Sequence, residues 1–158
     1  MDKNAETAIA KKMIREMLYI TLATSDKKAI PWNTPVFYAC DRDYNFYWIS
    51  SQVCVHSVNI EENENVALVI YDSRVPEGKG VGVYIKAKAR LVTDNVEIAK
   101  AITLLYRKKG KPAPRLSEFN EGAPRRVYVA TPVTVWVNDL KAKGGEEFRY
   151  LRLEIQLK

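Results

Sequence analysis

Few side chains in this sequence could act as nucleophiles or soft metal ligands. His56 is the only histidine, and thirteen residues separate the two cysteines, Cys40 and Cys54. A structural zinc site usually needs four such ligands, with some of them closely spaced, so we expect no metal site. We expect no disulfide either and interpret both cysteines as buried, inert thiols. His56 could activate one serine or cysteine, but no neighbouring motif orients such a pair.

The motifs of the common catalytic and phosphate-binding loops are absent. The chain contains no GxGxxG after a strand, no GxxxxGKS/T and no GxSxG. The usual dinucleotide cradle, P-loop and hydrolase nucleophile are therefore not expected. Acidic residues are plentiful, yet the sequence alone places no pair of them in one cleft. If the protein is an enzyme, we expect a bound cofactor to carry the reaction.

The charge of the chain is positive but dispersed. Lys and Arg number 25 against 19 Asp and Glu, a formal net charge of +6, and the densest basic run is 107–109 with Lys111 just beyond. No zinc-finger or RNA-recognition pattern accompanies this run. We therefore expect no nucleic-acid partner, and interpret the charge as a bias toward anions, including phosphorylated small molecules.

Length and composition fit a single globular domain spanning residues 1–158. The chain is 47% hydrophobic and 28% charged, which is typical of a domain with one core. No apolar run reaches the roughly 18 residues that a membrane span needs. The first residues also lack the apolar region of a secretory signal. We expect a cytoplasmic protein with no membrane contact.

The first third of the chain predicts one helix followed by antiparallel strands. Ile9, Met13 and Met17 recur at helical spacing within 5–18. Residues 19–24 are rich in strand formers, the polar turn 25–28 follows, and 30–38 and 44–50 read as the next two strands. The strand 30–38 contains Pro31 and Pro35, which have no backbone N–H to donate to a neighbouring strand. Their presence indicates an edge strand, a bulge or a stretch that faces a ligand.

The rest of the chain predicts two more helices and four more strands. A short helix is expected within 51–65 and an amphipathic one over 96–106, with Asp94 or Asn95 as its N-cap. The strands are expected at 66–71, 81–92, 126–137 and 148–156, with loops at 72–80 and 108–122 and a turn at Lys143-Gly144-Gly145. The total is about seven strands and three helices. Tight turns and the absence of βαβ alternation favour a mainly β, α+β fold, an antiparallel barrel with helices packed outside.

Three stretches, in this order, resemble the pyridoxamine 5'-phosphate oxidase-like FMN-binding split β-barrels. The first is Leu22-Ala23-Thr24 with the strand PWNTPVFY. The second is YWISSQVCVHSVNIEENENVALVIYD, residues 47–72. The third is the pair IKAKARLV and RVYVATPVTVWVND. Together they span nearly the whole chain, and the resemblance implies a split barrel that holds one FMN per subunit at the interface of a homodimer.

The resemblance also implies roles for individual residues. Asn33, Thr34 and Pro35 would lie along the flavin ring, and Ile49, Ser50 and Ser51 would meet the flavin or its phosphate. His56 and Ser57 would complete the phosphate site, and Trp136 would approach the ring from the partner subunit. A phosphate site at the start of this helix is physically reasonable. The free N–H groups of a helix N-terminus favour a dianion, and the serine hydroxyls add hydrogen-bond donors.

Each of these residues also has a purely structural interpretation. Ser50 and Ser51 could cap the helix that follows them, and His56 could be a surface or structural residue. Asn33 and Thr34 could belong to an ordinary edge strand, and Trp136, between two valines, could be a barrel residue. The order of the family motifs favours the functional interpretation.

The sequence departs from the vitamin-oxidising members at two places. A gapless alignment puts Val55-His56 where those members carry Arg-Lys at the phosphate, and Thr34 and Ala39 replace basic residues on the second strand. Phosphate binding would then be weaker, or one of Lys86, Lys88, Arg107 and Lys108 would compensate. The C-terminal substrate-binding pattern of histidine and arginine is also missing, which disfavours pyridoxamine 5'-phosphate as the substrate.

The function predicted from the sequence is therefore that of an FMN-binding, flavin-dependent oxidoreductase. Its flavin would pass electrons from a donor such as NAD(P)H to an unidentified small molecule, and no catalytic acid or base is assigned. One alternative is a flavin-binding module without turnover, used for sensing or storage. Another is the same fold with a deazaflavin or heme in place of FMN.

Overall fold

The fold is a curled antiparallel sheet with helices around it. The structure, a computed structural model, describes residues 3–77, 80–138 and 152–158. In these ranges it contains three α-helices, one 3-10 helix (η1) and eight strands. The elements are α1 (Lys3–Glu16), β1 (Tyr19–Ser25), β2 (Pro31–Phe37), β3 (Ala39–Cys40), β4 (Phe46–Ser51), α2 (Val55–Glu62), β5 (Asn65–Tyr71), β6 (Gly82–Leu91), α3 (Asn95–Lys109), η1 (Leu116–Glu118), β7 (Arg125–Asn138) and β8 (Arg152–Ile155).

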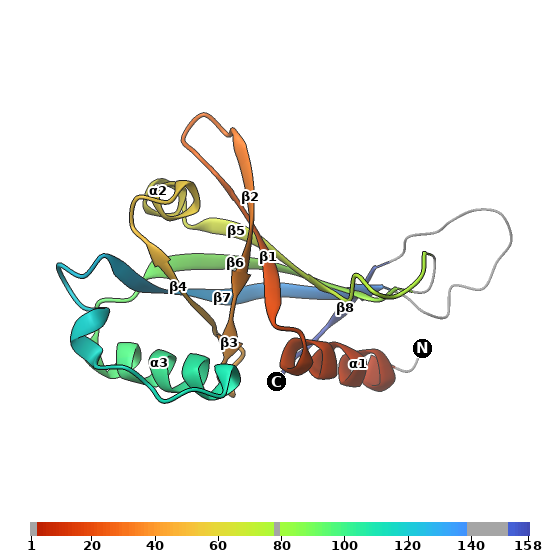
Figure 1. The fold of residues 1–158 in the computed structure, drawn as a ribbon. Helices are drawn as coiled ribbons and strands as arrows, with labels where there is room; N and C mark the ends of the chain where they lie inside the picture. Colours follow the sequence, from red (N-terminus) through yellow and green to blue (C-terminus); the bar gives the residue numbers. More distant parts are fainter. Residues whose placement is uncertain (1–2, 78–79, 139–151) are drawn as a thin grey trace, which may run out of the picture.

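All eight strands belong to one sheet in the order β2-β1-β5-β6-β7-β4-β3, with β8 paired to β7. The first half of β7 pairs with β4, and its last residues pair with β8. Figure 1 shows α1 and α3 on one side of the curled sheet, while α2 lies on the other side beside the projecting β1–β2 hairpin. The two edges of the sheet, β2 and β3, follow each other directly in the chain.

This continuity closes the barrel at one end and leaves it split at the other. β2 pairs with β1, and after Tyr38 the chain continues as β3, which pairs with β4 through Ala39↔Tyr47 and Cys40↔Phe46. If that second ladder continued into β2, Phe37 would face Ile49 and Val36 would face Ser50. Instead β2 stays with β1, so a gap between β2 and β4 opens just beyond Tyr38.

The prolines of β2 occupy positions that face this gap. The Tyr38 amide donates to the Leu18 carbonyl at 3.3 Å, and the Asp26 amide donates to the Ile30 carbonyl at 3.2 Å. Because hydrogen-bonded pairs alternate along an antiparallel ladder, the backbone groups of Pro31, Asn33, Pro35 and Phe37 point away from β1. The two missing proline N–H groups therefore cost the β1–β2 ladder nothing, and the predicted edge position is confirmed.

Two apolar clusters hold the barrel and its helices together. The interior is filled by inward-facing strand residues with Ala10 and Ile14 of α1 and Ile60 of α2. The alternation predicted for β6 is confirmed, with Val83, Ile85, Ala87 and Ala89 buried between exposed basic residues. The second cluster packs Ile98, Ala101, Ile102 and Leu105 of α3 against the outer faces of β3, β4 and β7.

The predicted α+β split barrel is confirmed, with differences in detail. There are eight described strands rather than about seven, because the predicted strand 30–38 gives way at Tyr38 and its continuation pairs with a different neighbour. α1 ends at Glu16, and α3 runs on to Lys109, between an Asp94 N-cap and Gly110 in the left-handed region. The predicted loop 108–122 contains η1. The turn at 143–145 lies outside the described residues.

None of the helices in the described ranges combines the length and the apolar character that a membrane crossing requires. Both cysteines are free thiols but only half-buried, so the prediction that they are buried is wrong in that respect.

Candidate functional site

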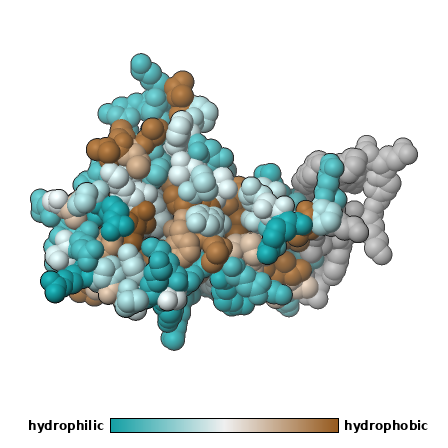
Figure 2. Space-filling model, in the orientation of Figure 1, coloured by the Kyte–Doolittle hydropathy of each residue, from teal (hydrophilic) through white to brown (hydrophobic). Residues whose placement is uncertain are grey.

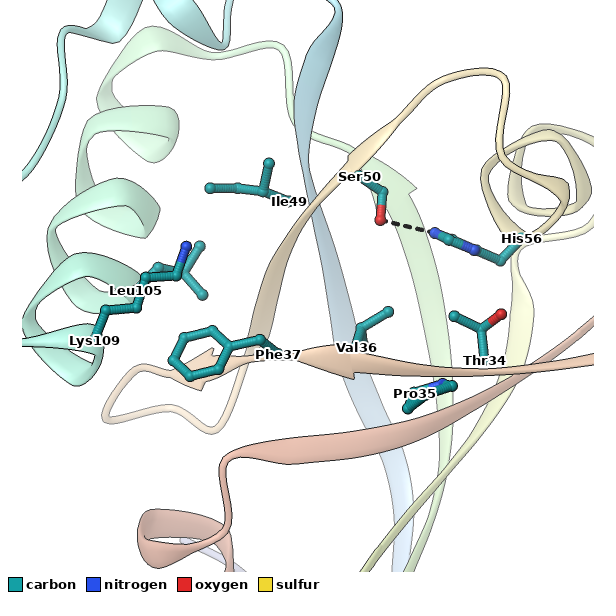
Figure 3. Close-up of a pocket in the computed structure, with 9 residues that line it drawn as sticks. All are labelled: Thr34, Pro35, Val36, Phe37, Ile49, Ser50, His56, Leu105 and Lys109. Carbon is teal, nitrogen blue, oxygen red and sulfur yellow. Dashed lines mark hydrogen bonds between the residues drawn. The ribbon is translucent and has the colours of Figure 1, made fainter.

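A cavity of about 210 Å³ occupies the gap between β2 and β4. Figure 3 shows its walls: β2 on one side, β4 on the other, and the two helices α2 and α3 at opposite ends. It is lined by Thr34, Pro35, Val36, Phe37, Ile49, Ser50, His56, Leu105 and Lys109. The cavity therefore forms where the β3–β4 ladder would have continued if β2 had not turned away.

His56 and Ser50 form the polar end of the cavity. His56 lies in the first turn of α2, and its Nε2 is 2.8 Å from the Ser50 Oγ at the end of β4. His56 is 6% exposed as a residue, and its burial lowers the pKa of the imidazole below its ordinary value. An imidazole with a lowered pKa is neutral at pH 7. One of its two ring nitrogens then donates a hydrogen bond and the other accepts one, and the tautomer decides which.

Polar contacts to the β1–β2 hairpin fix the position of α2. Asn59, one turn after His56, donates from Nδ2 to the Thr24 Oγ1 at 3.0 Å, and both residues are buried. Asn63, just after the helix, donates to the Ser25 Oγ at 3.0 Å. These bonds from Asn59 and Asn63 to β1 hold α2 in the orientation that lets His56 reach the cavity.

The α3 end of the cavity combines apolar and cationic groups. Leu105 is buried, and Lys109 follows one turn later on the same helix face. The Lys109 ammonium lies 5.3 Å from the centre of the Phe37 ring and 4.4 Å from that of Tyr106. Burial, and then the nearby positive charges of Arg125 and Lys111, lower the pKa of Lys109. This end therefore favours an anion over a cation.

The donor set of the cavity suits a ligand that is flat and apolar in one part and anionic in another. No carboxylate is among the nine lining residues; the polar groups are hydroxyls, an imidazole and an ammonium. Phe37, Ile49, Pro35 and Leu105 supply apolar walls. The volume lies below the roughly 300–1,000 Å³ of most ligand pockets, so one chain alone does not enclose such a ligand.

Five of the nine residues predicted for the site line this cavity, and four do not. Lining it are Thr34, Pro35, Ile49, Ser50 and His56. Asn33 is exposed on β2, and Ser51 is half-buried at the end of β4. Ser57 is fully buried, and its hydroxyl lies next to that of Tyr128 on β7 rather than in the cavity. Trp136 lies on β7 opposite Tyr84, with the Lys86 ammonium 5.5 Å from its ring centre.

The sequence analysis missed four lining residues: Val36, Phe37, Leu105 and Lys109. The first two extend the predicted β2 stretch by two positions. Leu105 and Lys109 are four residues apart, a spacing that puts them on one helix face, but only the packing of α3 against β4 shows that this face meets the cavity. Patterns within one element cannot supply that information.

None of the four basic residues named as substitutes for Arg-Lys lines the cavity. Lys86 lies over Trp136, and Lys88 pairs with Glu64. Lys108 donates to the Met17 carbonyl at 2.6 Å and lies 3.9 Å from the centre of the Tyr38 ring. Arg107 is exposed on α3. The lining of this cavity therefore gives no support to compensation by these four residues, one of the two alternatives that the sequence left open.

Comparisons with known proteins agree with this architecture. HutZ, the heme storage protein from Vibrio cholerae, has a TM-score of 0.67 at 18% identity, covering 79% of this chain and 88% of that one. A heme binding protein from Mycobacterium smegmatis gives 0.68 at 17% identity, with 95% and 57% covered. An F420 reductase gives 0.59 at 18% identity, with 79% and 94% covered.

At these identities the structural likeness speaks for the fold. The search of curated proteins gives no match. The family model described as pyridoxamine 5'-phosphate oxidase matches residues 7–139, which include most of α1 and every element from β1 through β7. The chain belongs to the pyridoxamine 5'-phosphate oxidase family of split β-barrels.

Proposed function

We propose that this protein binds FMN in the cavity between β2 and β4 and acts as a flavin-dependent oxidoreductase. The observation that carries the proposal is that apolar walls lie between a polar end at Ser50 and His56 and the Lys109 ammonium, with no carboxylate among the lining residues. FMN has the same division, with a flat ring system at one end and a phosphate monoester at the other. Bound FMN would supply the electron transfer that the side chains of this chain cannot perform.

The residues present fit this group. Ser50 and His56 would hold the phosphate, assisted by the backbone N–H groups at the start of α2 and by Ser51. Thr34, Pro35 and Ile49, with Asn33 beside them, would lie along the ring and exclude water from it. Phe37 and Leu105 extend this apolar wall. The electron donor would be a small molecule such as NAD(P)H.

We also propose that a homodimer completes the site. The cavity of one chain is small and open, so a second wall is needed to enclose a flavin. Exposed apolar side chains surround α2 and the β1–β2 hairpin (Figure 2): Ile30 is 60% exposed, Val53 85% and Val55 48%. Such patches usually mark an interface, and two-fold pairing is the commonest solution. Trp136 would then reach the flavin of the partner subunit.

Heme is a second candidate, because a neutral histidine lines the cavity. The lowered pKa of His56 leaves its imidazole in the form that binds iron. The Vibrio cholerae and Mycobacterium smegmatis neighbours, whose names state heme storage and heme binding, share the fold. FMN remains preferred because the Nε2 of His56 is already hydrogen-bonded to Ser50 and is not free to bind iron. A phosphate, in contrast, could accept hydrogen bonds from His56 and Ser50 together.

Titration of the apoprotein tests the proposal. FMN, FAD, riboflavin and hemin are added separately and followed by flavin fluorescence or the heme absorption band. We expect FMN to bind most tightly, because the short polar end accommodates a phosphate monoester and the chain has no dinucleotide motif. Tighter binding of FAD or hemin than of FMN would overturn the proposal. Pyridoxamine 5'-phosphate should not be oxidised by the loaded protein, and hydrogen peroxide release with that compound would contradict this.

A further inference from the structure

Arg126 opens the stretch RVYVATPVTVWVND, in which the sequence analysis gave it no role, and it is a buried cation next to the cavity. It lies near the start of β7 and is 6% exposed. Its Nε donates to the Phe119 carbonyl at 3.2 Å, and one terminal nitrogen approaches the Gln52 Oε1 at 3.4 Å. Both acceptors are neutral. Within the described residues no carboxylate forms an ion pair with this guanidinium.

A buried guanidinium with only neutral acceptors is unusual on energetic grounds. Removing a charge from water costs several kcal/mol unless a countercharge or a full set of hydrogen bonds compensates. Arginine has five N–H donors in a planar fork that matches a phosphate or carboxylate, and the contacts to Phe119 and Gln52 in the described part of the chain engage two of them. An anionic ligand would supply the countercharge that the neutral acceptors do not.

The register of the sheet places Arg126 beside the polar end of the cavity. Arg126 pairs directly with Ser50 across the β4–β7 ladder. Directly opposed residues carry side chains on the same face, with Cβ atoms about 4.5–5.5 Å apart. A group bound to the Ser50 hydroxyl is therefore within reach of the Arg126 side chain. Gln52, which contacts the guanidinium, belongs to the loop that leads into α2 and His56.

We propose that Arg126 supplies the positive charge for a phosphate monoester bound at Ser50 and His56. This inference rests on the proposed FMN function. It places a positively charged side chain next to the phosphate, because the first turn of α2 contains no Lys or Arg. Gln52 and the Phe119 carbonyl hold the guanidinium in place before the ligand arrives. The neutral His56 and the serine hydroxyl then orient the phosphate, while Arg126 compensates its charge.

Replacing Arg126 and comparing two flavins tests this role. Dissociation constants of FMN and riboflavin are measured for the wild type, Arg126→Met, Arg126→Lys and, as the matched control, Arg107→Met on the exposed face of α3. Losing a hydrogen bond to a charged group typically costs about ten- to a hundred-fold in affinity. We expect Arg126→Met to lose that factor for FMN and almost nothing for riboflavin, with Arg126→Lys in between and Arg107→Met unchanged.

The outcomes separate the two proposals. If the wild type prefers FMN over riboflavin and Arg126→Met keeps the same preference, the role of Arg126 is refuted while FMN binding stands. If the wild type shows no preference for FMN, the phosphate site and the role of Arg126 both fail. An Arg126 that only ties Gln52 to the Phe119 loop would weaken both flavins equally, and that result also refutes the proposal.

A measurement on the wild type covers the case in which Arg126→Met does not fold. The Nε–H signals of the arginine side chains are recorded by NMR on the 15N-labelled protein with FMN, with riboflavin or with neither. FMN should shift the signal of Arg126 and riboflavin should not, while the signal of Arg107 should be the same in all three samples. An Arg126 signal that responds equally to both flavins would overturn the inference.

Discussion

Breaking the Thr24–Asn59 hydrogen bond should both destabilise the barrel and disturb the candidate site. Asn59→Ala removes a 3.0 Å bond between two buried side chains and leaves the Thr24 hydroxyl without a partner. A neutral hydrogen bond contributes about 0.5–1.5 kcal/mol net, and an unsatisfied buried group costs about 1–3 kcal/mol. We expect the free energy of unfolding to fall by about 2 kcal/mol, which for a chain of this length lowers the Tm by roughly 4–8 °C.

A double-mutant cycle isolates the interaction itself. Urea unfolding is measured for Asn59→Ala, Thr24→Val and the double variant, with Val58→Ala as the control on the exposed face of the same helix. The double variant should be less destabilised than the sum of the single ones, with a coupling of about 0.5–1.5 kcal/mol. Val58→Ala should change stability by no more than about 0.5 kcal/mol, because Val58 lies at the surface.

The same variants report on the site, because Asn59 holds the helix that carries His56. If FMN binds as proposed, Asn59→Ala should weaken it while Val58→Ala should not. A coupling near zero would mean that the observed bond does not hold α2 in place. A normal coupling with unchanged FMN affinity would show that α2 does not contribute to the flavin site.

Three further predictions concern pH, a helix end and the subunit interface. Burial lowers the pKa of His56, so on acidification the unfolded chain is protonated at His56 before the folded chain is. The free energy of unfolding should therefore fall as the pH drops below about 6.5. In urea titrations His56→Gln should make this pH dependence less steep, and an unchanged slope would assign the pH dependence to other groups. Gly110 has a φ of +64° with open space around its Cα, so Gly110→Ala should cost about 1–2 kcal/mol in thermal unfolding, whereas Gly80→Ala should cost clearly less. Trp136→Ala should weaken FMN binding and dimerisation together in sedimentation experiments; a stable monomer that keeps its FMN would refute the shared site.

The strands and helices were predictable because their signals are local. Alternation over 81–92 and the amphipathic pattern over 96–106 each reflect one buried face, and the structure confirms both. The prolines of β2 correctly indicated an edge strand that borders a cavity. The break at Tyr38 was missed, because strand propensity continues through it while the pairing partner changes from β1 to β4.

The candidate site was predictable only where neighbours in the sequence are also neighbours in space. Ser50 and His56 lie on the two sides of one strand–helix connection, so their proximity follows from a short stretch of chain. Arg126 and Lys109 reach the same region through sheet register and helix packing across long separations. Ser57 was placed by its position next to His56, but the helix turns its side chain into the interior, where it is fully buried.

The outward-facing prolines of β2 have a consequence for how copies of this chain behave in concentrated solution. A sheet edge that stays open for a small molecule is equally open to an extended strand of another chain, and such edges promote aggregation. Of the four outward positions in β2, Pro31 and Pro35 offer no N–H, so an incoming strand would meet a ladder lacking half of its donors. The groove can thus accept a compact ligand without becoming a template for intermolecular β-pairing. Redesigns that enlarge this groove should keep both prolines, because replacing them with strand formers would favour fibrous assemblies over ligand capture.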